Sequence, residues 1–350
     1  MWKENESYRL IKVLLFNIVL FIFLLILGEI AIRIFKPKYE IYARTYPGQY
    51  KDRFFNDGTT IVNWPKKDND LGWVCNNISK HLKFSNKRYN NLQIKYNINS
   101  QGFRCRYDFS WSDSNESKII MLGDSFLFGV YLKDDETIAA NLFKEFKNRI
   151  NFVNLGIPGF GIDQMYLTYI KFNEVLKSKL IILFYIDDDI YRTWEAFRLT
   201  EGMNKPSFII KDNNLVLRKY EKTSFLELIF QKSYFLNVFY KKYSHLQSKN
   251  LTGKIFEKLI DKTLKNNQKL LIIRFPTDYQ LLNNDPFRNL SFNKLLKGGN
   301  IYYYEMFNDL KKLGKDKIKK MYLKNDGHLT PYGAKIVAHY IHNVLSKILS

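Results

Sequence analysis

The longest apolar run in the chain lies close to its start. Between Val13 and Phe35, every residue is apolar apart from Asn17, Glu29 and Arg33. A helix over this run would be about 34 Å long, which is enough to cross a hydrocarbon core of about 30 Å. The pattern therefore predicts one transmembrane helix, with both of its charges near the C-terminal end.

From Lys118 onward, short apolar runs alternate with segments of helical spacing. The runs predict strands over Lys118 to Leu122, Asn151 to Leu155, Leu180 to Ile186 and Lys269 to Phe275. Helices are predicted over Thr137 to Phe146, Gln164 to Leu176 and Tyr332 to Leu349. Asp134 or Asp135 is expected to cap the first helix. This alternation is typical of βαβ units and a parallel sheet.

The pattern divides the chain into three regions. We expect a tail and anchor over 1–36, a stalk and small β-rich lead-in over 37–116, and an α/β domain over 117–350. An insertion at about 201–253 interrupts the α/β alternation and carries no catalytic motif. A lid, a partner surface and a decorative subdomain are all consistent with it.

The charge balance is strongly basic, with 55 Lys and Arg against 34 Asp and Glu and a formal charge of +21. This excess suits anionic surfaces such as phospholipid headgroups or acidic glycans, or is a plain solvated basic surface. No nucleic-acid-binding motif is present, so we expect no nucleic-acid partner. Cys75 and Cys105 are the two cysteines, and either a disulfide or two separate thiols fits the sequence.

The position of the predicted span near the N-terminus indicates its orientation in the membrane more clearly than its flanking charges do. Basic residues lie on both sides of it: Lys3, Arg9 and Lys12 before, and Arg33, Lys36 and Lys38 after. No small-residue cleavage pattern comes after the span, so we expect an uncleaved anchor. A lone N-terminal span usually serves to export the domain behind it, so we place the α/β domain on the extracytoplasmic side.

A candidate nucleophile stands at the end of the first strand of the α/β domain. The run Ile119 to Leu122 stops at Gly123, Asp124 and Ser125. Open α/β sheets bind ligands at the carboxyl ends of their strands. Gly123 lets the chain turn sharply, so Ser125 would begin a helix with its amide N–H facing a reacting oxyanion.

Serine needs a base within hydrogen-bond reach, and His328 is the best candidate among five histidines. It follows Asp326 by two residues and precedes a turn and the closing helix, so it lies on a loop. Asp326 would hold the imidazole tautomer and stabilise the imidazolium, as the carboxylate does in a Ser-His-Asp triad.

Two further strand ends carry candidate groups. Asn154 to Gly161 is a glycine-rich turn whose Gly159 N–H could face a developing oxyanion. The acids Asp187, Asp188 and Asp189 follow the third strand. They lack His or Cys partners, so we expect no metal site there.

These four segments resemble the sequence blocks of the SGNH (GDSL-type) hydrolase family, from about Lys118 to Leu349 without the insertion. The lead-in resembles family members that carry an N-terminal membrane anchor. The resemblance implies a flavodoxin-like three-layer α/β/α sandwich. It also implies that Ser125 is the nucleophile, that Asp326 and His328 complete the triad, and that Ser125 and Gly159 supply oxyanion-hole amides.

The chain departs from the family at one donor of the oxyanion hole. The family places an Asn side chain there, and the aligned position is Asp187. An ionised carboxylate would repel an oxyanion, and losing one donor costs about 2.7–4 kcal/mol of transition-state stabilisation. Either Asp187 is protonated, or it points away and the two amides act alone, or turnover is weak.

We therefore expect a membrane-anchored, extracytoplasmic serine esterase or acyl hydrolase that works through an acyl-serine intermediate. Its substrate would be an ester on a small molecule, a surface glycan or a lipid. No cofactor is expected. Two alternatives remain: an O-acyltransferase that uses the same triad, and a degenerate module that binds a glycan or a partner protein.

Overall fold

The structure is a computed structural model of the 350-residue chain. It describes residues 6–36, 42, 44, 59–62, 65–76, 81–86, 92–105, 118–198, 202–219, 223–286, 299–324 and 326–350. The chain forms two compact units: Met1–Pro47 with Lys222–Leu246, and Gly48–Glu221 with Gln247–Ser350.

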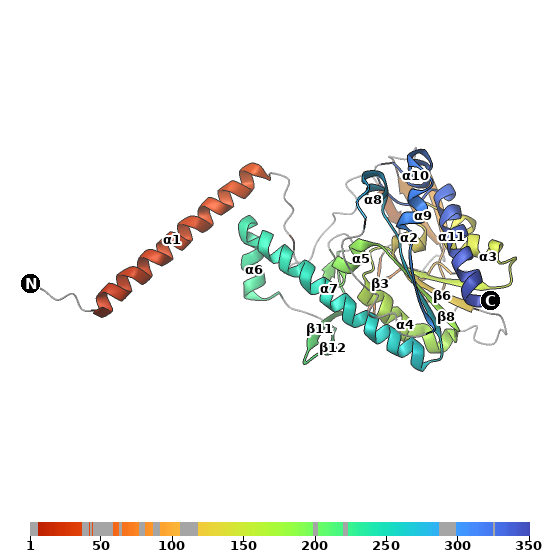
Figure 1. Cartoon of the computed structure of the whole chain (residues 1–350), viewed down its shortest axis with the longest axis horizontal. Helices are drawn as coiled ribbons and strands as arrows, with labels where there is room; N and C mark the ends of the chain where they lie inside the picture. The colour runs from red at the N-terminus through yellow and green to blue at the C-terminus, as the bar shows by residue number, and fades with distance from the viewer. Residues whose placement is uncertain are drawn as a thin grey trace, which may run out of the picture. The chain divides into compact units, whose positions relative to one another are not determined.

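A five-stranded parallel sheet forms the centre of the larger unit (Figure 1). Its strands are β6 (Lys118–Gly123), β7 (Asn151–Gly156), β8 (Leu180–Tyr185), β13 (Lys269–Arg274) and β14 (Ile301–Glu305). They lie in the order β14-β13-β8-β6-β7, the flavodoxin-like order in which the first strand lies between the second and the third. The predicted fold class is therefore confirmed, and β14 is a strand that the sequence pattern did not indicate.

Helices cover both faces of the sheet because the strands are apolar on both sides. Ile120 and Leu122 point to the layer of α4 (Ile162–Leu176) and the C-terminal half of α7 (Tyr234–Lys265). Ile119 and Met121 point to the opposite layer. That layer holds α3 (Ile138–Glu145), α9 (Phe307–Lys311), α10 (Lys315–Met321) and α11 (Pro331–Leu349).

The start of α3 differs from the expectation. Thr137 caps this helix, since its Oγ1 accepts a hydrogen bond from the Ala140 N–H at 3.1 Å. Asp134 and Asp135 instead belong to a separate 3-10 helix, η2 (Asp134–Glu136). The prediction that one of these acids caps α3 is wrong, because the extended backbone at Thr137 separates the two turns.

Small antiparallel sheets come before the domain and interrupt it. The lead-in holds a sheet of β1 (Thr59–Val62), β4 (His81–Asn86) and β5 (Leu92–Asn97), and a hairpin of β2 (Lys66–Asp68) and β3 (Gly72–Val74). Two further hairpins lie at the insertion: β9 (Phe197–Arg198), just before it, pairs with β10 (Met203–Asn204), and β11 (Ser207–Lys211) pairs with β12 (Asn214–Arg218). Cys75 and Cys105 are both free thiols.

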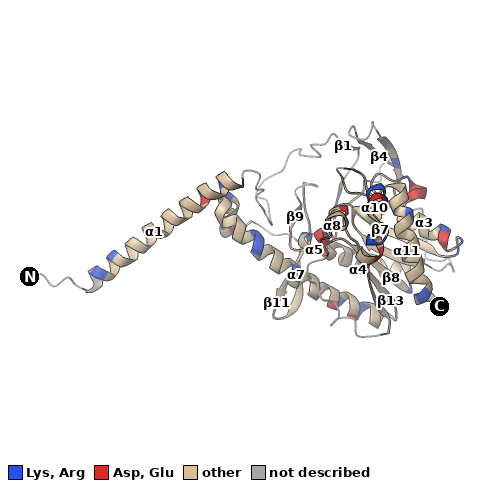
Figure 2. Ribbon diagram, turned by 45° about the horizontal axis from the view of Figure 1, so that its top comes forward, with Lys and Arg blue, Asp and Glu red and all other residues tan. Residues whose placement is uncertain are grey.

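The smaller unit contains α1 (Glu6–Phe35), α6 (Phe225–Lys232) and the first part of α7. Within α1, Tyr8–Phe35 is long and apolar enough to cross a membrane. In Figure 2, the Lys, Arg, Asp and Glu residues of this helix lie near its two ends, and residues of other types lie between them.

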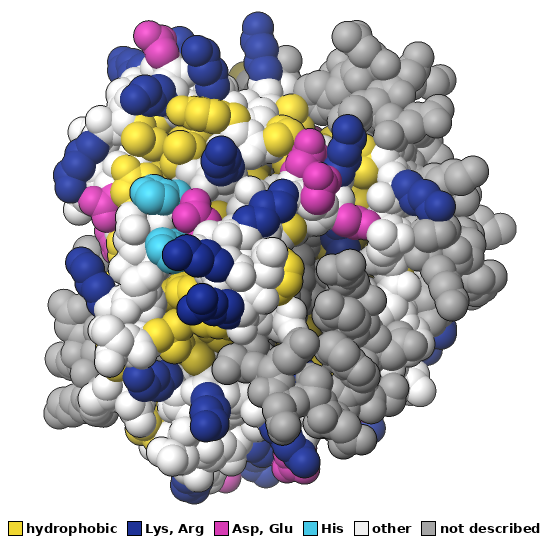
Figure 3. All heavy atoms as spheres, turned by 90° about the vertical axis from the view of Figure 1, so that its right-hand side faces the viewer, with side chains coloured by type: hydrophobic (Ala, Val, Ile, Leu, Met, Phe, Trp, Pro, Cys, Tyr) yellow, Lys and Arg dark blue, Asp and Glu magenta, His cyan; other side chains and the backbone are white. Residues whose placement is uncertain are grey.

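The basic charge excess is visible on the surface of the larger unit. Figure 3 shows the face that carries α3 and α11, where Lys and Arg side chains are spread among fewer acidic ones. A surface of this kind favours anionic partners in general without selecting one.

Candidate active site

The order of the strands places Ser125 where the sheet changes direction. The strand β6 lies between β7 and β8, so its carboxyl end is the topological switch point at which open α/β sheets bind ligands. Ser125 is the first residue of α2 (Ser125–Phe128), which follows β6 after a single residue. Asp124 caps this helix by accepting the Phe126 N–H at 2.9 Å.

Gly123 makes this turn possible because no side chain fits there. A Cβ at this position would lie 2.7 Å from the Leu127 Cβ and 3.0 Å from the Phe184 carbonyl oxygen. Both distances are shorter than ordinary van der Waals contacts. The glycine therefore allows α2 to start close against the neighbouring strand.

The structure brings Ser125, His328 and Asp326 together. His328 Nε2 lies 2.8 Å from the Ser125 Oγ, and His328 Nδ1 lies 2.5 Å from Asp326 Oδ1. Ser125 is 8% exposed, and the His328 side chain is 23% exposed. The distances lie within the reach that general-base catalysis requires, and the serine is largely buried.

Two features of the loop hold the carboxylate against the imidazole. The His328 amide N–H also donates to Asp326 Oδ1, at 3.1 Å, so one residue contacts this oxygen twice. Gly327 between them has φ of 88°, a left-handed backbone that glycine adopts without strain. The Asp-Gly-His spacing therefore closes a tight turn around the ring.

Tyr131 is a residue of this site that the sequence analysis missed. Its hydroxyl donates to Asp326 Oδ2 at 2.6 Å, and its own N–H donates to the Tyr96 hydroxyl at 3.0 Å. Burial alone would raise the pKa of Asp326, but the hydrogen bonds from His328 and Tyr131 outweigh it and lower this pKa. Asp326 therefore stays ionised beside the imidazole.

Arg104 of the lead-in orders the loop that carries Tyr131. Its guanidinium donates to the carbonyl oxygens of Phe128, Gly129 and Leu132 at 2.6–3.0 Å. The same group pairs with Asp134 at 2.8 Å and is almost fully buried. The lead-in thus fixes the backbone directly after the nucleophile helix.

The turn after β7 carries Gly159, which has φ of 79°. Trp73 Nε1 donates to the Pro158 carbonyl oxygen at 3.1 Å, and the Gly161 N–H donates to Gln164 Oε1 at 3.3 Å. These bonds hold the turn from both sides. In the described part of the chain, neither the Ser125 N–H nor the Gly159 N–H has a hydrogen-bond acceptor.

A buried cluster joins the ends of β6 and β8 behind the serine. Arg192 Nη1 lies 2.6 Å from Asp189 Oδ1 and 3.3 Å from Asp124 Oδ2, and both carboxylates are fully buried. Burial and the neighbouring Asp124 charge raise the pKa of Asp189 well above its usual range. Asp189 also accepts the Ile186 N–H at 2.9 Å, which fixes the start of α5 (Asp187–Arg192).

Asp187 does not act as a hydrogen-bond donor here. Its Oδ1 accepts from Arg274 Nε and Nη2 at 2.8 and 2.6 Å, and its Oδ2 accepts from Gln280 Nε2 at 3.1 Å. Burial raises the pKa of Asp187, but Arg274 opposes this shift. Asp187 is therefore the counter-ion of Arg274. The three successive acids diverge, because Asp188 is exposed and Asp189 is buried against Arg192.

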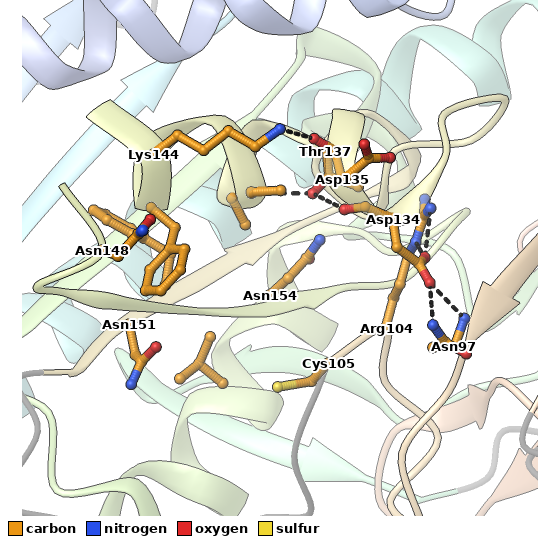
Figure 4. A pocket seen from close by; sticks show the side chains of 15 residues that line it. Asn97, Arg104, Cys105, Asp134, Asp135, Thr137, Lys144, Asn148, Asn151 and Asn154 are labelled. Carbon is orange, nitrogen blue, oxygen red and sulfur yellow. Dashed lines mark hydrogen bonds and ion pairs between the residues drawn. The ribbon is translucent and has the colours of Figure 1, made fainter. Parts of the chain in front are cut away.

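A cavity of about 610 Å³ lies elsewhere in the larger unit (Figure 4). It is bounded by β7, α3 and the lead-in residues Asn97, Arg104 and Cys105. Ser125 and His328 are not among its lining residues. Several of its polar groups are engaged in structural bonds, such as the bond from Asn154 Nδ2 to the Leu127 carbonyl oxygen at 2.9 Å.

The chain resembles the GDSL-type hydrolases in the solved structures to which it is similar. An acetyl xylan esterase is 15% identical with a TM-score of 0.42, over 65% of this chain and 99% of that one. A GDSL-like lipase from Bacteroides thetaiotaomicron VPI-5482 is 14% identical with a TM-score of 0.38, over 66% of this chain and 88% of that one.

A two-domain esterase active on acetylated mannans is 13% identical with a TM-score of 0.40, over 67% of this chain and 49% of that one. No family model matches the sequence, and no curated protein does.

Proposed function

We propose that the chain is a membrane-anchored serine esterase that cleaves acyl esters through an acyl-Ser125 intermediate. The observation that carries this proposal is the 2.8 Å contact between His328 Nε2 and the Ser125 Oγ, with Asp326 on the other ring nitrogen. This arrangement can activate a hydroxyl that is otherwise a weak nucleophile.

In the first half of the reaction, the Ser125 Oγ attacks the carbonyl carbon of the ester while its proton moves to His328 Nε2. The ionised Asp326 stabilises the imidazolium that forms. The tetrahedral intermediate then expels the alkoxide, which takes the proton from His328 Nε2 and leaves as an alcohol. The acyl group remains bound to the Ser125 Oγ.

In the second half, water attacks the acyl carbon and gives its proton to the same ring nitrogen. The intermediate collapses, the Ser125 Oγ leaves and takes up this proton, and the carboxylic acid departs. The enzyme returns to its starting protonation state, and no cofactor is consumed.

The amides of Ser125 and Gly159 would bind the oxyanion in both halves, since in the described part of the chain both N–H groups are without an acceptor. Asp187 contributes no donor because both of its oxygens accept from Arg274 and Gln280. With one side-chain donor fewer than the family pattern, we expect a rate about 10²–10³-fold below that of a three-donor site.

The proposed location is the extracytoplasmic face of the membrane, since one apolar helix near the N-terminus precedes the domain among the described residues. An O-acylated surface glycan or lipid is the proposed substrate class, because such esters lie within reach of an anchored enzyme and its basic surface suits acidic polymers. An intact Ser-His-Asp arrangement argues against a degenerate binding module.

A fluorophosphonate probe tests the nucleophile on the full-length protein in detergent. We expect covalent labelling that maps to Ser125 and is lost in Ser125→Ala. Ser346→Ala is a matched control, because the Ser346 Oγ also lies near a histidine, 3.4 Å from His342 Nε2, on the exposed side of α11. Equal labelling of the wild type and Ser125→Ala would remove the assignment.

A further inference from the structure

The end of α1 packs against the insertion through specific contacts within the smaller unit. Glu29 Oε2 accepts hydrogen bonds from the Ser233 hydroxyl and the Phe235 N–H, each at 3.0 Å. A Cβ on Gly28 would lie 2.4 Å from the Phe235 ring, so the glycine allows this ring to approach the helix. The first turn of α7 therefore packs directly against α1.

A second set of contacts joins α6 and α7 into one hairpin. The Phe230 and Tyr240 rings are stacked with centroids 5.1 Å apart, and Asn237 Nδ2 donates to the Phe230 carbonyl oxygen at 3.0 Å. Asn237 also exchanges two hydrogen bonds of 2.8 Å with the backbone of Tyr42, which follows α1. The helical part of the insertion is thus fixed to the chain just after the predicted span.

This hairpin exposes large apolar side chains. On α6, Phe225 is 76% exposed and Leu226 is 65% exposed, and Ile229 lies on the same face at the next turn. On α7, Phe239 is 58% exposed and stands one turn after Phe235. Tyr243 continues the same stripe of α7. Apolar patches of this kind on a soluble surface indicate a site that something apolar covers.

The length of α1 places this face at a membrane surface. A hydrocarbon core takes about 20 helical residues, so the 28 residues of Tyr8–Phe35 exceed it by about eight. Arg9 and Lys12 are charged at the N-terminal end of this stretch and Glu29 and Arg33 at its C-terminal end, so the excess is shared between the two ends. Glu29 then lies near the boundary between hydrocarbon and headgroups, and the start of α7 that it binds lies at the same depth.

Basic side chains accompany the apolar ones. Lys232 ends α6, and Lys242 lies on α7 three residues after Phe239. Both are exposed. Lysines beside exposed aromatic and aliphatic residues are typical of helices that lie in the interface of a membrane with anionic lipids.

We propose that α6 and the first turns of α7 lie in the membrane interface and form a second lipid contact of this protein. Phe225, Leu226 and Phe239 enter the acyl region, while Lys232 and Lys242 face phospholipid headgroups. The proposal rests on α1 being a membrane span. The smaller unit would then contact lipid through both α1 and the helical part of the insertion.

Photo-crosslinking to lipid tests this on the full-length protein reconstituted in vesicles of phosphatidylethanolamine and phosphatidylglycerol. The crosslinking analogue p-benzoylphenylalanine replaces one residue at a time: Phe225, Phe239, the span residue Phe23, or Tyr279. Tyr279 is a matched control because it is 63% exposed on α8 (Asp278–Asn283) of the larger unit. Thermal unfolding verifies that each variant is folded.

We expect phospholipid adducts at Phe23, Phe225 and Phe239, with the yields at the last two within about threefold of that at Phe23, and none above background at Tyr279. Adducts at Phe23 without adducts at Phe225 and Phe239 would overturn the second contact while the anchor stands. So would adducts at these two positions to polypeptide instead of lipid. Absence of lipid adducts at Phe23 would overturn the anchor and the second contact together.

Discussion

Replacing Asp187 with asparagine separates two roles for this position. If Asp187 occupied the place of an oxyanion donor, asparagine would restore the donor and raise turnover about 10²–10³-fold. The structure instead makes Asp187 the partner of Arg274, whose side chain is 3% exposed. Asparagine removes the negative charge and leaves a buried guanidinium without its counter-ion.

The size of the effect depends on the burial of the pair. Breaking a buried ion pair by removing one partner costs about 3–5 kcal/mol. We take the lower value, about 3 kcal/mol, because the Asp187 side chain is 22% exposed and an asparagine oxygen can still accept from Arg274. For a domain of this size, that corresponds to a fall in Tm of about 6–12 °C.

The assay combines thermal unfolding with hydrolysis of p-nitrophenyl acetate at a temperature below both transitions. We expect a lower Tm for Asp187→Asn and no increase in kcat/KM. Asp188→Asn is the control, since this neighbouring acid is exposed and its loss should change stability by less than about 0.5 kcal/mol. An unchanged Tm together with a hundredfold rise in kcat/KM would refute the counter-ion role.

Three further predictions concern the carboxylate of the site and the anchor. Tyr131→Phe removes a hydrogen bond to a charged group and should lower kcat about tenfold with little change in KM; an unchanged kcat would show that Tyr131 does not position Asp326. The pKa of Asp326 is lowered in the folded state, so the ionised carboxylate stabilises the fold. This contribution is complete above about pH 4 and is lost as the pH falls through the folded pKa. Asp326→Asn should therefore flatten the acid limb of a curve of unfolding free energy against pH. A limb of unchanged slope would count against this. The full-length chain should resist carbonate extraction from membranes, and its release would contradict the anchor.

The fold could be predicted from sequence where burial produces a continuous apolar run. The strands β6 and β8 are such runs, because both of their faces are covered by helices. The strand β14 was missed because it lies at the edge of the sheet, where Tyr302, Tyr303 and Tyr304 are only half-buried. The aromatic residues of β14 therefore form no continuous apolar run that would distinguish this strand from the segments around it.

The meeting of Ser125 with His328 was predictable because each motif has a local signal. Gly-Asp-Ser ends an apolar run, and Asp-Gly-His precedes a helix that Pro331 and the Thr330 cap begin. Tyr131 had no such signal. Its contact with Asp326 depends on a positive φ of 68° and on bonds that the lead-in makes with this loop.

The role of Asp187 required the order of the strands. Arg274 ends β13 and pairs in register with Tyr185 of β8, two residues before Asp187. No local pattern in the sequence indicates that β13 is the neighbour of β8, since 83 residues lie between the end of β8 and the start of β13. The role of Asp187 therefore depends on long-range strand pairing, whereas its local sequence pattern favoured a different role.

The most direct test of the proposed chemistry is a double-mutant cycle on Ser125 and His328, measured as kcat/KM for a small acyl ester. If the two residues act as one unit, Ser125→Ala and His328→Ala should each lower kcat/KM by on the order of 10³-fold or more, and the double variant should be no worse than either single variant within about threefold. Losses that multiply in the double variant, or a single variant that keeps wild-type kcat/KM, would contradict a serine activated by this histidine.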